Sequence, residues 1–480
     1  MTLWPIVRSR PRSPRLSADG AWTATTHTIL RGASWLARSE LLVVLVIAPV
    51  LLAARPLLLA YAATFLIPLL WLLVRKVRGR SASTVYDAPL LHFLVLLPLS
   101  QAAVTDISLA APKLLGLVLG VALLRAVSRG LGTRRSLWLV GWVIVALTAS
   151  IALVGLVATD WLSGKLLPLE PLYARLPRVP GVALPRTSGG GIHPNEVAGT
   201  LALLFPISLA VAVSWRARAA LRLLLVAAVL LTALVLVLTQ SRMGYLGASC
   251  GLLVLFLGWL VASRRRWAWV LAAMLAGASV AGIRLLGANL FSGASLSEAG
   301  NNLDTLGGRL ELWDRALYML RDFSYTGIGL GQFSRVLHAL YVPFLIPPDT
   351  WVPHAHNFVL QVALDLGIPA AAAFFVLVAV GMVRMVRAAA RPEPAIRGLA
   401  LGCLGGLVAF LVFGLGDAIA PGAKPGALLW VTLGLAEALW VFPRTGAAAD
   451  HPLSAQWRTR EAVDHVGHRR RRLNSCPTDA

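Results

Sequence analysis

The chain alternates between long apolar stretches and short polar connections along most of its length. The stretches are rich in leucine, alanine and glycine, and most are close to the ~20 residues that a helix needs to cross a bilayer. They cover residues 41–54, 57–74, 88–104, 110–126, 137–158, 196–214, 220–239, 243–262, 267–283, 357–383, 398–416 and 427–442. Because apolar and polar residues do not alternate within them, they predict helices and not a membrane barrel. The sequence therefore predicts an all-α integral membrane protein with about twelve transmembrane helices.

Basic residues are concentrated in every second connection between these stretches. They precede the first stretch, follow the second, fourth, sixth, eighth and tenth, and close the chain: Arg31 and Arg38, Arg75 to Arg80, Arg125 to Arg135, Arg216 to Arg222, Arg264 to Arg266, Arg384 to Arg397, and Arg469 to Arg472. Connections rich in lysine and arginine stay in the cytoplasm. The pattern places both termini there, with a basic arm at 1–39 and a tail at 446–480 that we expect to be disordered, on either side of a membrane domain at 40–445.

Two connections on the opposite, periplasmic or external side are much longer than the rest. The first covers residues 159–195, and the second covers 284–356 between the ninth and tenth stretches. A connection as long as the second is uncommon unless it has a function, and binding residues often lie on loops. We therefore expect the chemistry of this protein on the external side.

The composition excludes several classes of protein. Hydrophobic residues make up 58% of the chain and charged residues 14%, with a mean hydropathy of +0.74, which excludes an ordinary water-soluble globule. The net charge of +23 is explained by cytoplasmic loops that meet anionic lipid head groups, so membrane lipids and not nucleic acid are the expected partners. The three cysteines have no metal-binding spacing.

The second long connection contains two recognisable segments. Residues 308–322 place Leu310, Trp313, Ala316, Leu317 and Leu320 at helical spacing. Such a helix either lies in the outer membrane interface with this stripe facing the lipid or packs on the transmembrane bundle. The following glycine-rich segment, GIGLGQF at 327–333, neither follows a strand nor opens a βαβ unit, so we expect a tight turn and not a nucleotide-binding loop.

Polar residues on the external side gather in four places. These are Arg186 to Glu196, Gln240 to Gly244, Gly308 and Arg309 with Trp313, and His354 to Asn357 with Gln361 and Asp365 beyond. Arg242 and Arg309 either snorkel to lipid phosphates or bind a substrate phosphate or diphosphate, for which the planar guanidinium is well suited. His193 and Glu196 are candidates to line the same site.

His354 and His356 are bases that titrate near neutral pH. Their position at the mouth of a helix favours a general base. Metal binding is disfavoured because no third ligand with tight spacing stands nearby in the sequence, and we expect no cofactor. Asp365 is a candidate to orient a histidine or to pair with an arginine, and a structural ion pair is the other interpretation.

These residues together indicate a group transfer from a diphosphate. Nucleotide-activated donors are absent outside the cytoplasmic membrane, so the donor there must already be activated. A polyprenyl diphosphate glycan meets this condition. Fixed guanidinium groups stabilise the departing anion, and a general base deprotonates the acceptor hydroxyl.

Four segments resemble the signature of the bacterial O-antigen ligase and O-antigen polymerase family. They are TQSRMGYLG at 239–247, GGRLELW at 307–313, the GIGLGQF segment, and HAHNFVLQVALDLGIP at 354–369. The resemblance covers roughly residues 185–420. It implies a GT-C-like fold with about twelve transmembrane helices, a large periplasmic loop, and a metal-independent, inverting glycosyl transfer from undecaprenyl diphosphate in the bacterial inner membrane.

The resemblance also implies roles for individual residues. Arg242 and Arg309 match arginines that bind the donor diphosphate. Arg186, His193 and Gln240 are further substrate-binding candidates because they stand in the same external polar clusters, and not because of the resemblance. His356 matches the catalytic base, and His354 is the second candidate.

The acceptor is either lipid A core, as for a ligase, or a growing polysaccharide, as for a polymerase. A secondary transporter and a polysaccharide-export protein are the alternative functions, but the matching halves typical of many transporters are absent.

Overall fold

The structure is a computed structural model that describes residues 39–54, 57–79, 83–161, 169–176, 191–215, 217–262, 270 and 306–442. Its helices are α2 (Glu40–Ala53), α3 (Leu57–Arg78), α4 (Asp87–Ala102), α5 (Ile107–Gly130), α6 (Arg134–Ala158), α7 (Glu170–Tyr173), α8 (Pro194–Ser214), α9 (Ala219–Leu238), α10 (Arg242–Ala262), α12 (Leu306–Asp322), α13 (Phe333–Leu340), α14 (Phe358–Leu366), α15 (Ile368–Ala389), α16 (Pro394–Phe413) and α17 (Ala427–Val441). Apart from residues 39 and 270, both tails predicted to be disordered and the expected span at 267–283 lie outside the described residues.

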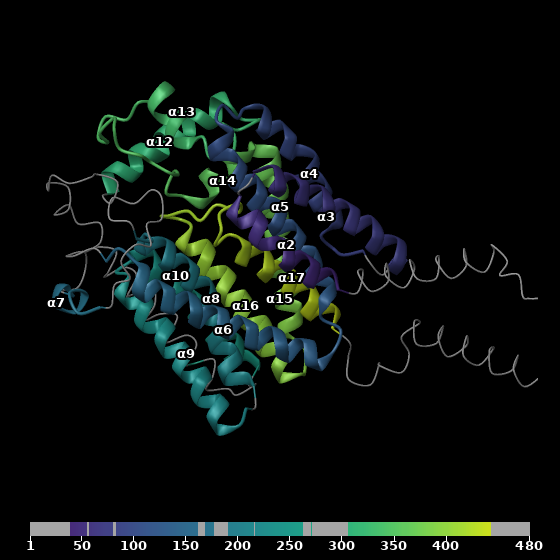
Figure 1. Cartoon of the computed structure of the whole chain (residues 1–480). Coiled ribbons are helices and arrows are strands. Elements are labelled where there is room, and N and C mark those ends of the chain that lie inside the picture. Colours follow the sequence, from purple (N-terminus) through teal and green to yellow (C-terminus); the bar gives the residue numbers. More distant parts are fainter. Residues whose placement is uncertain are drawn as a thin grey trace, which may run out of the picture.

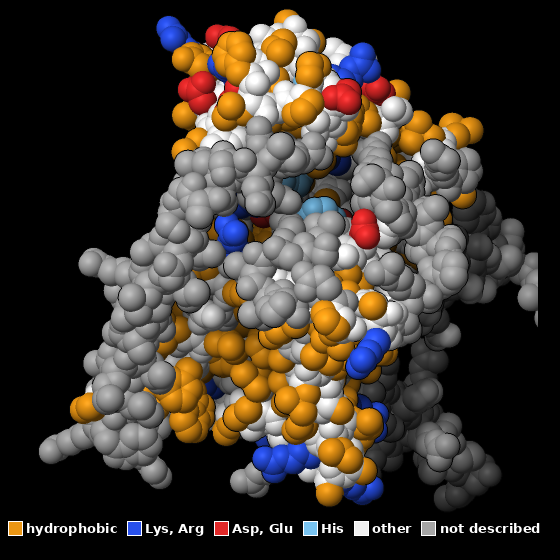
Figure 2. All heavy atoms as spheres, turned by 90° about the vertical axis from the view of Figure 1, so that its left-hand side faces the viewer, with side chains coloured by type: hydrophobic (Ala, Val, Ile, Leu, Met, Phe, Trp, Pro, Cys, Tyr) orange, Lys and Arg blue, Asp and Glu red, His pale blue; other side chains and the backbone are white. Residues whose placement is uncertain are grey.

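The described part of the chain is an all-α, multi-pass membrane protein. Eight of its helices are long and apolar enough to cross a membrane, and three shorter apolar helices, α2, α4 and α17, accompany them. Side chains on the outside of this bundle are strongly exposed, as for Leu58 (83%) and Leu223 (70%). Figure 2 shows the resulting hydrophobic surface, with lysine and arginine side chains near its lower end. This arrangement fits a bundle surrounded by lipid.

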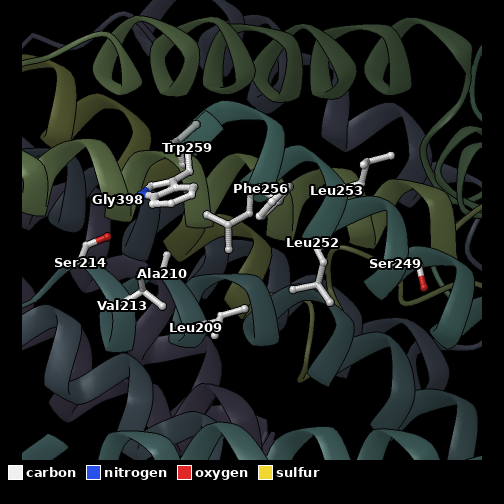
Figure 3. A pocket seen from close by; sticks show the side chains of 12 residues that line it. Leu209, Ala210, Val213, Ser214, Ser249, Leu252, Leu253, Phe256, Trp259 and Gly398 are labelled. Carbon is white, nitrogen blue, oxygen red and sulfur yellow. The ribbon is translucent and has the colours of Figure 1, made fainter. Parts of the chain in front are cut away.

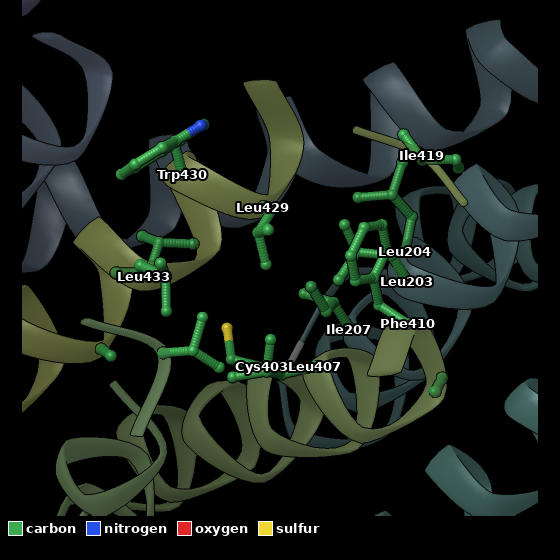
Figure 4. Packing of buried hydrophobic residues seen from close by; sticks show 14 of the residues in the cluster. Leu203, Leu204, Ile207, Cys403, Leu407, Phe410, Ile419, Leu429, Trp430 and Leu433 are labelled. Carbon is green, nitrogen blue, oxygen red and sulfur yellow. The ribbon is translucent and has the colours of Figure 1, made fainter. Parts of the chain in front are cut away.

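The bundle consists of two groups of helices joined by α15, α16 and α17 (Figure 1). One group is α6, α8, α9 and α10, and its main partner is α16. The other is α2 to α5, which packs on α15 and α17. Apolar side chains from α8, α16 and α17 meet at the centre, among them Leu203, Leu407 and Leu429 (Figure 4).

Glycines bring α10 and α16 unusually close. A Cβ added to Gly405 would lie 2.5 Å from the Gly251 carbonyl oxygen, and one added to Gly251 would lie 2.4 Å from the Gly405 carbonyl oxygen. Such contacts between backbones are typical of membrane helices, because van der Waals packing takes the place of the hydrophobic effect in lipid.

The expected span at 357–383 is two helices. Helix α14 ends at Leu366, and α15 starts at Ile368 after Gly367, which has a φ of +81°. A Cβ on Gly367 would lie 2.1 Å from the Tyr325 carbonyl oxygen. The close approach of the 325–327 backbone therefore requires glycine here and breaks the helix. As a result α14 is a short helix at one end of the bundle, and α15 begins the crossing.

Helices α12 and α13 form a cap over α14 at that end of the bundle (Figure 1). Their common core contains Leu312, Ala316, Met319, Phe333 and Leu337, all buried. The predicted helix at 308–322 is present and packs on protein, but the predicted stripe is wrong in part, since Leu310 is 51% and Leu317 58% exposed.

The inward side of α12 carries polar residues for which the hydrophobic pattern gave no role. Glu311 accepts hydrogen bonds from the backbone N–H groups of Phe344 and Leu345, at 2.5 and 2.9 Å. Arg315 lies over the Phe344 ring, 5.1 Å from its centroid. The face of α12 that contacts the 344–345 segment is therefore partly polar, and it differs from the face that the apolar spacing predicts.

The GIGLGQF segment is the expected tight turn, and it attaches the cap to the link between α4 and α5. Gly327, Gly329 and Gly331 all have positive φ. Gln332 accepts hydrogen bonds from the Thr105 hydroxyl (2.9 Å) and the Asp106 N–H (3.1 Å), and it donates to the Asp106 carbonyl (3.0 Å). The cap is therefore fixed to the bundle by partly buried hydrogen bonds to the buried side chain of Gln332.

Candidate functional site

The HAHN segment lies where the cap meets the bundle, directly before α14. Asn357 is the N-cap of α14, and its side-chain oxygen accepts the Leu360 N–H at 3.1 Å. Its Nδ2 donates to the Leu415 carbonyl at 3.2 Å, and the Phe358 N–H donates to the Gly414 carbonyl at 2.6 Å. Asn357 thus starts α14. It also holds the connection between α16 and α17 (residues 414–426, the α16–α17 turn) against that helix.

Three side chains meet at this junction. Asp417 Oδ1 lies 3.4 Å from Nδ1 of His356 and 3.6 Å from Nε2 of His354. The two imidazole rings pack edge to face, with their centroids 4.3 Å apart. Figure 2 shows histidine side chains in a hollow below the cap, with charged side chains of both signs around it. The two predicted bases therefore share one carboxylate.

Asp417 is the main functional candidate that the sequence analysis missed. Its Oδ1 also accepts the Ala418 N–H and its Oδ2 accepts a hydrogen bond from Nδ2 of Asn195, both at 2.8 Å. Burial alone would raise the pKa of this carboxyl, but His356, His354 and Arg309 outweigh burial and hold the pKa well below its usual range. The side chain is therefore a fixed anion. Its one signal in the sequence was that it is an isolated acid beside a short connection that the pattern of basic residues predicts to be external.

The hydrogen bonds assign different roles to the two nitrogens of each ring. The backbone N–H of His356 donates to Nδ1 of His354 at 3.2 Å, so this nitrogen carries no proton and Nε2 carries the proton that faces Asp417. Burial, together with the neighbouring charge of His356, lowers the pKa of His354 to about 3 against the opposing effect of Asp417, so the ring is neutral. In His356 it is Nδ1 that faces Asp417, which leaves Nε2 for a substrate.

Arg309 lies in the first turns of α12, at the edge of the cap. Its Nε is buried and has no hydrogen-bond partner among the described residues. The positive charge of Arg309 helps to lower the pKa of Asp417. A partly buried guanidinium with a donor unused among the described residues, within electrostatic reach of Asp417, is suited to an anionic ligand.

Arg242 is the first residue of α10, and its side chain is exposed. The start of the helix is fixed by Ser241, whose hydroxyl accepts the Gly244 N–H at 3.2 Å. The next residue, Met243, packs against the α16–α17 turn, because a Cβ on Gly416 would lie 2.9 Å from the Met243 sulfur. The structure therefore brings the α10 end with Arg242 beside the turn that carries Asp417.

Asp365 does not orient a histidine. Its Oδ2 lies 3.6 Å from Nζ of Lys113 on α5, and its Oδ1 accepts the Gly331 N–H at 3.1 Å. The structural ion pair, one of the two interpretations of the sequence, is the one observed. Lys113 also adds a positive charge facing His354.

His193 and Glu196 lie at the start of α8, which an isolated parallel β-bridge between Thr159 and Ile192 ties to the end of α6. His193 caps α8, with its Nδ1 accepting the Asn195 N–H at 3.2 Å. Glu196 interacts electrostatically with Lys424 and Asp417. Both residues therefore border the histidine pair, and their roles toward substrate stay predictions.

The other substrate-binding candidates differ in what the structure says of them. The Gln240 amide is buried and donates to the Tyr173 hydroxyl at 2.7 Å, which fixes the α9–α10 turn to α7. Its substrate-binding role stays a prediction, with its donor already engaged. Arg186 lies outside the described residues.

The structure adds a possible third metal ligand that lies far from the two histidines in the sequence. His354, His356 and Asp417 offer ligand atoms that all lie within 4.8 Å of one another. The donor set fits a metal poorly, however, because Nδ1 of His354 accepts a hydrogen bond and its Nε2 therefore keeps the proton. A metal-bound histidine instead donates from its second nitrogen, and the charges of Arg309 and Lys113 add repulsion.

An apolar cavity of about 650 Å³ lies between α8, α10 and α16. Its lining includes Leu252, Phe256 and Trp259 from α10, and the described residues around it include no titratable side chain (Figure 3). The cavity lacks the groups for proton transfer, so the polar junction at the cap is the better candidate for a reaction.

Comparison with known families matches one segment of the chain. Residues 227–375 match the family model described as O-antigen ligase. This O-antigen ligase segment contains Arg242, Arg309, His354 and His356, and it ends before Asp417. The resemblance seen in the sequence is confirmed over this range, which supports a membrane enzyme that transfers glycans. No curated protein matches the chain.

Proposed function

We propose that this protein is a membrane glycosyltransferase that moves a glycan from a polyprenyl diphosphate to an acceptor hydroxyl on the external face of the cytoplasmic membrane. The observation that carries the proposal is the junction of His356, Asp417 and Arg309, which combines a candidate base, its fixed carboxylate and a guanidinium with an unpaired donor. The O-antigen ligase segment supports the same reaction class. The donor is undecaprenyl diphosphate-linked glycan, and the acceptor is lipid A core or a growing polysaccharide.

In the proposed reaction, Nε2 of neutral His356 takes the proton of the acceptor hydroxyl. The oxygen attacks the anomeric carbon of the donor sugar and forms the new glycosidic bond. The bond from that carbon to the diphosphate oxygen breaks, and its electron pair leaves with the diphosphate. Because attack and departure occur on opposite faces in one displacement, the anomeric carbon is inverted.

The surrounding charges fit the charge changes of that step. Asp417 stabilises the His356 imidazolium that forms and keeps Nδ1 as the protonated nitrogen, as the carboxylate does in hydrolase triads. Arg309, with Arg242 at the start of α10, binds the departing diphosphate. Guanidinium groups that are fixed before the reaction stabilise developing charge without reorganisation. A metal ion is then not required.

The test is transfer by the purified protein in liposomes that contain a polyprenyl diphosphate glycan and either lipid A core or a glycan acceptor. We expect a higher-mass product by mass spectrometry in the presence of EDTA, at the same rate as with added magnesium. Asp417→Asn, which retains an acceptor oxygen but loses the charge, is the matched inactive variant. No product with either acceptor would contradict the proposed function, and transfer that EDTA abolishes would contradict its metal-free mechanism.

A further inference from the structure

His356 has an unusual backbone conformation for a residue that must aim a side chain. Its φ is +49°, in the left-handed region, where non-glycine residues are uncommon. Strain of this kind persists only where neighbouring contacts hold it. The contact available to the His356 backbone N–H is Nδ1 of His354, at 3.2 Å.

Both nitrogens of His354 are already engaged. Its Nδ1 accepts the His356 N–H, and its Nε2 points its proton at Asp417, 3.6 Å away. No lone pair is left to take a proton from an acceptor hydroxyl. His354 therefore lacks the free basic atom that a general base needs, although it stands two residues from His356 and is the same residue type.

We propose that His354 is a positioning residue, which locks the left-handed backbone of His356 and so aims Nε2 of His356 at the substrate. The inference rests on the proposed function, because it assigns a role within that reaction. The same chain shows the pattern a second time, where Nδ1 of His193 accepts the Asn195 N–H two residues on and caps α8. In both places a histidine acts as asparagine does in an Asx-turn.

The neighbours of the pair come from four elements. Asp417 faces both rings from the α16–α17 turn, Lys113 and His193 act on His354 from α5 and the start of α8, and Arg309 acts on Asp417 from α12. Burial, His356, Lys113 and His193 all disfavour a charged His354, against the opposing effect of Asp417. Nδ1 of His354 therefore stays free of a proton and can accept the His356 N–H.

Replacing His354 with asparagine or with glutamine distinguishes its contact with the His356 N–H from its contact with Asp417. The Oδ1 atom of asparagine occupies the place of Nδ1 and can accept the His356 N–H, whereas the longer glutamine places its amide near Nε2. We expect His354→Ala and His354→Gln to lower kcat by about 10²-fold, the effect of misplacing a catalytic group, with little change in KM. His354→Asn should recover at least tenfold over alanine, and its pH–rate profile should keep the acid midpoint of the wild type.

Two results would overturn the proposal. Equal loss in His354→Asn and His354→Ala would show that the backbone lock is not the role of this ring. A shifted or missing acid limb in His354→Asn would show that His354 carries the titrating proton.

A second measurement does not depend on transfer. In protein labelled with ¹⁵N-histidine at about pH 7, the His354 resonances, assigned by their loss in His354→Asn, should report an unprotonated Nδ1 and a protonated Nε2. A protonated Nδ1 would contradict the proposal even in an active protein. If the wild type transfers no glycan, the proposed function fails, and the tautomer still decides whether the lock exists.

Discussion

Replacing His356 with alanine is expected to lower the transfer rate about 10²–10⁴-fold, the usual contribution of a general base. The loss follows from the geometry, because the contacts of the pair with Asp417 and with the backbone, within the described residues, use Nδ1 of His356 and both nitrogens of His354. Nε2 of His356 is therefore left for the acceptor. Single-turnover transfer in liposomes measures this loss directly. The effect should appear in kcat, with donor KM nearly unchanged.

His92→Ala is a suitable control for this variant. His92 lies on α4, with Nδ1 within 2.8 Å of the Ala88 carbonyl, and it takes part in none of the junction contacts described above. We expect it to transfer at the wild-type rate. Full turnover in His356→Ala would show that another group removes the acceptor proton and that His356 is not the general base.

Replacing Arg309 with alanine is the second change with a large expected effect, a loss of about 10²–10³-fold in kcat. This is the loss typical when one fixed donor to a developing anion is removed. Arg309→Lys should recover only part of the rate, because an ammonium cannot present the planar fork of a guanidinium. The rates are measured with saturating donor, so that weaker binding alone does not explain the loss.

Arg315→Ala supplies the matched control for Arg309→Ala. Arg315 lies on the same helix, but it pairs with Glu311 and Asp314 and lies over Phe344. Its removal should affect the stability of the cap and leave kcat near the wild-type value. Equal losses in the two variants would mean that the cap, and not the charge of Arg309, is what the reaction requires.

Much of this fold could be predicted from hydropathy, because lipid imposes long apolar helices. Each expected span within the described residues falls on helix. The pattern could not reveal the break at Gly367, which depends on the approach of the Tyr325 carbonyl from a distant segment. It also misplaced the face of α12, because Glu311 and Arg315 point inward to bind a loop that packs on the helix.

The sequence predicted which residue types form the candidate site, but not which of these residues contact one another. The sequence singled out Arg242, Arg309 and the histidine pair. It left Asp365 either to orient a histidine, to pair with an arginine or to form a structural ion pair. The structure pairs that residue with Lys113 and places Asp417 beside both imidazoles. Asp417 follows a different helix, and only the packing of α14 against the α16–α17 turn brings it to the histidines. No spacing rule along one segment contains that information.

The most direct test of the central claim is the binding of a polyprenyl diphosphate to the purified protein in nanodiscs with EDTA present. A lost hydrogen bond to a charged group is worth about 1.5–3 kcal/mol, or roughly 10- to 100-fold in affinity. The wild type and Arg315→Ala should therefore bind the lipid equally well, and Arg309→Ala should bind it more weakly by that factor. Binding that requires a divalent cation, or that is unchanged in Arg309→Ala, would contradict the claim that guanidinium groups of this chain hold the diphosphate.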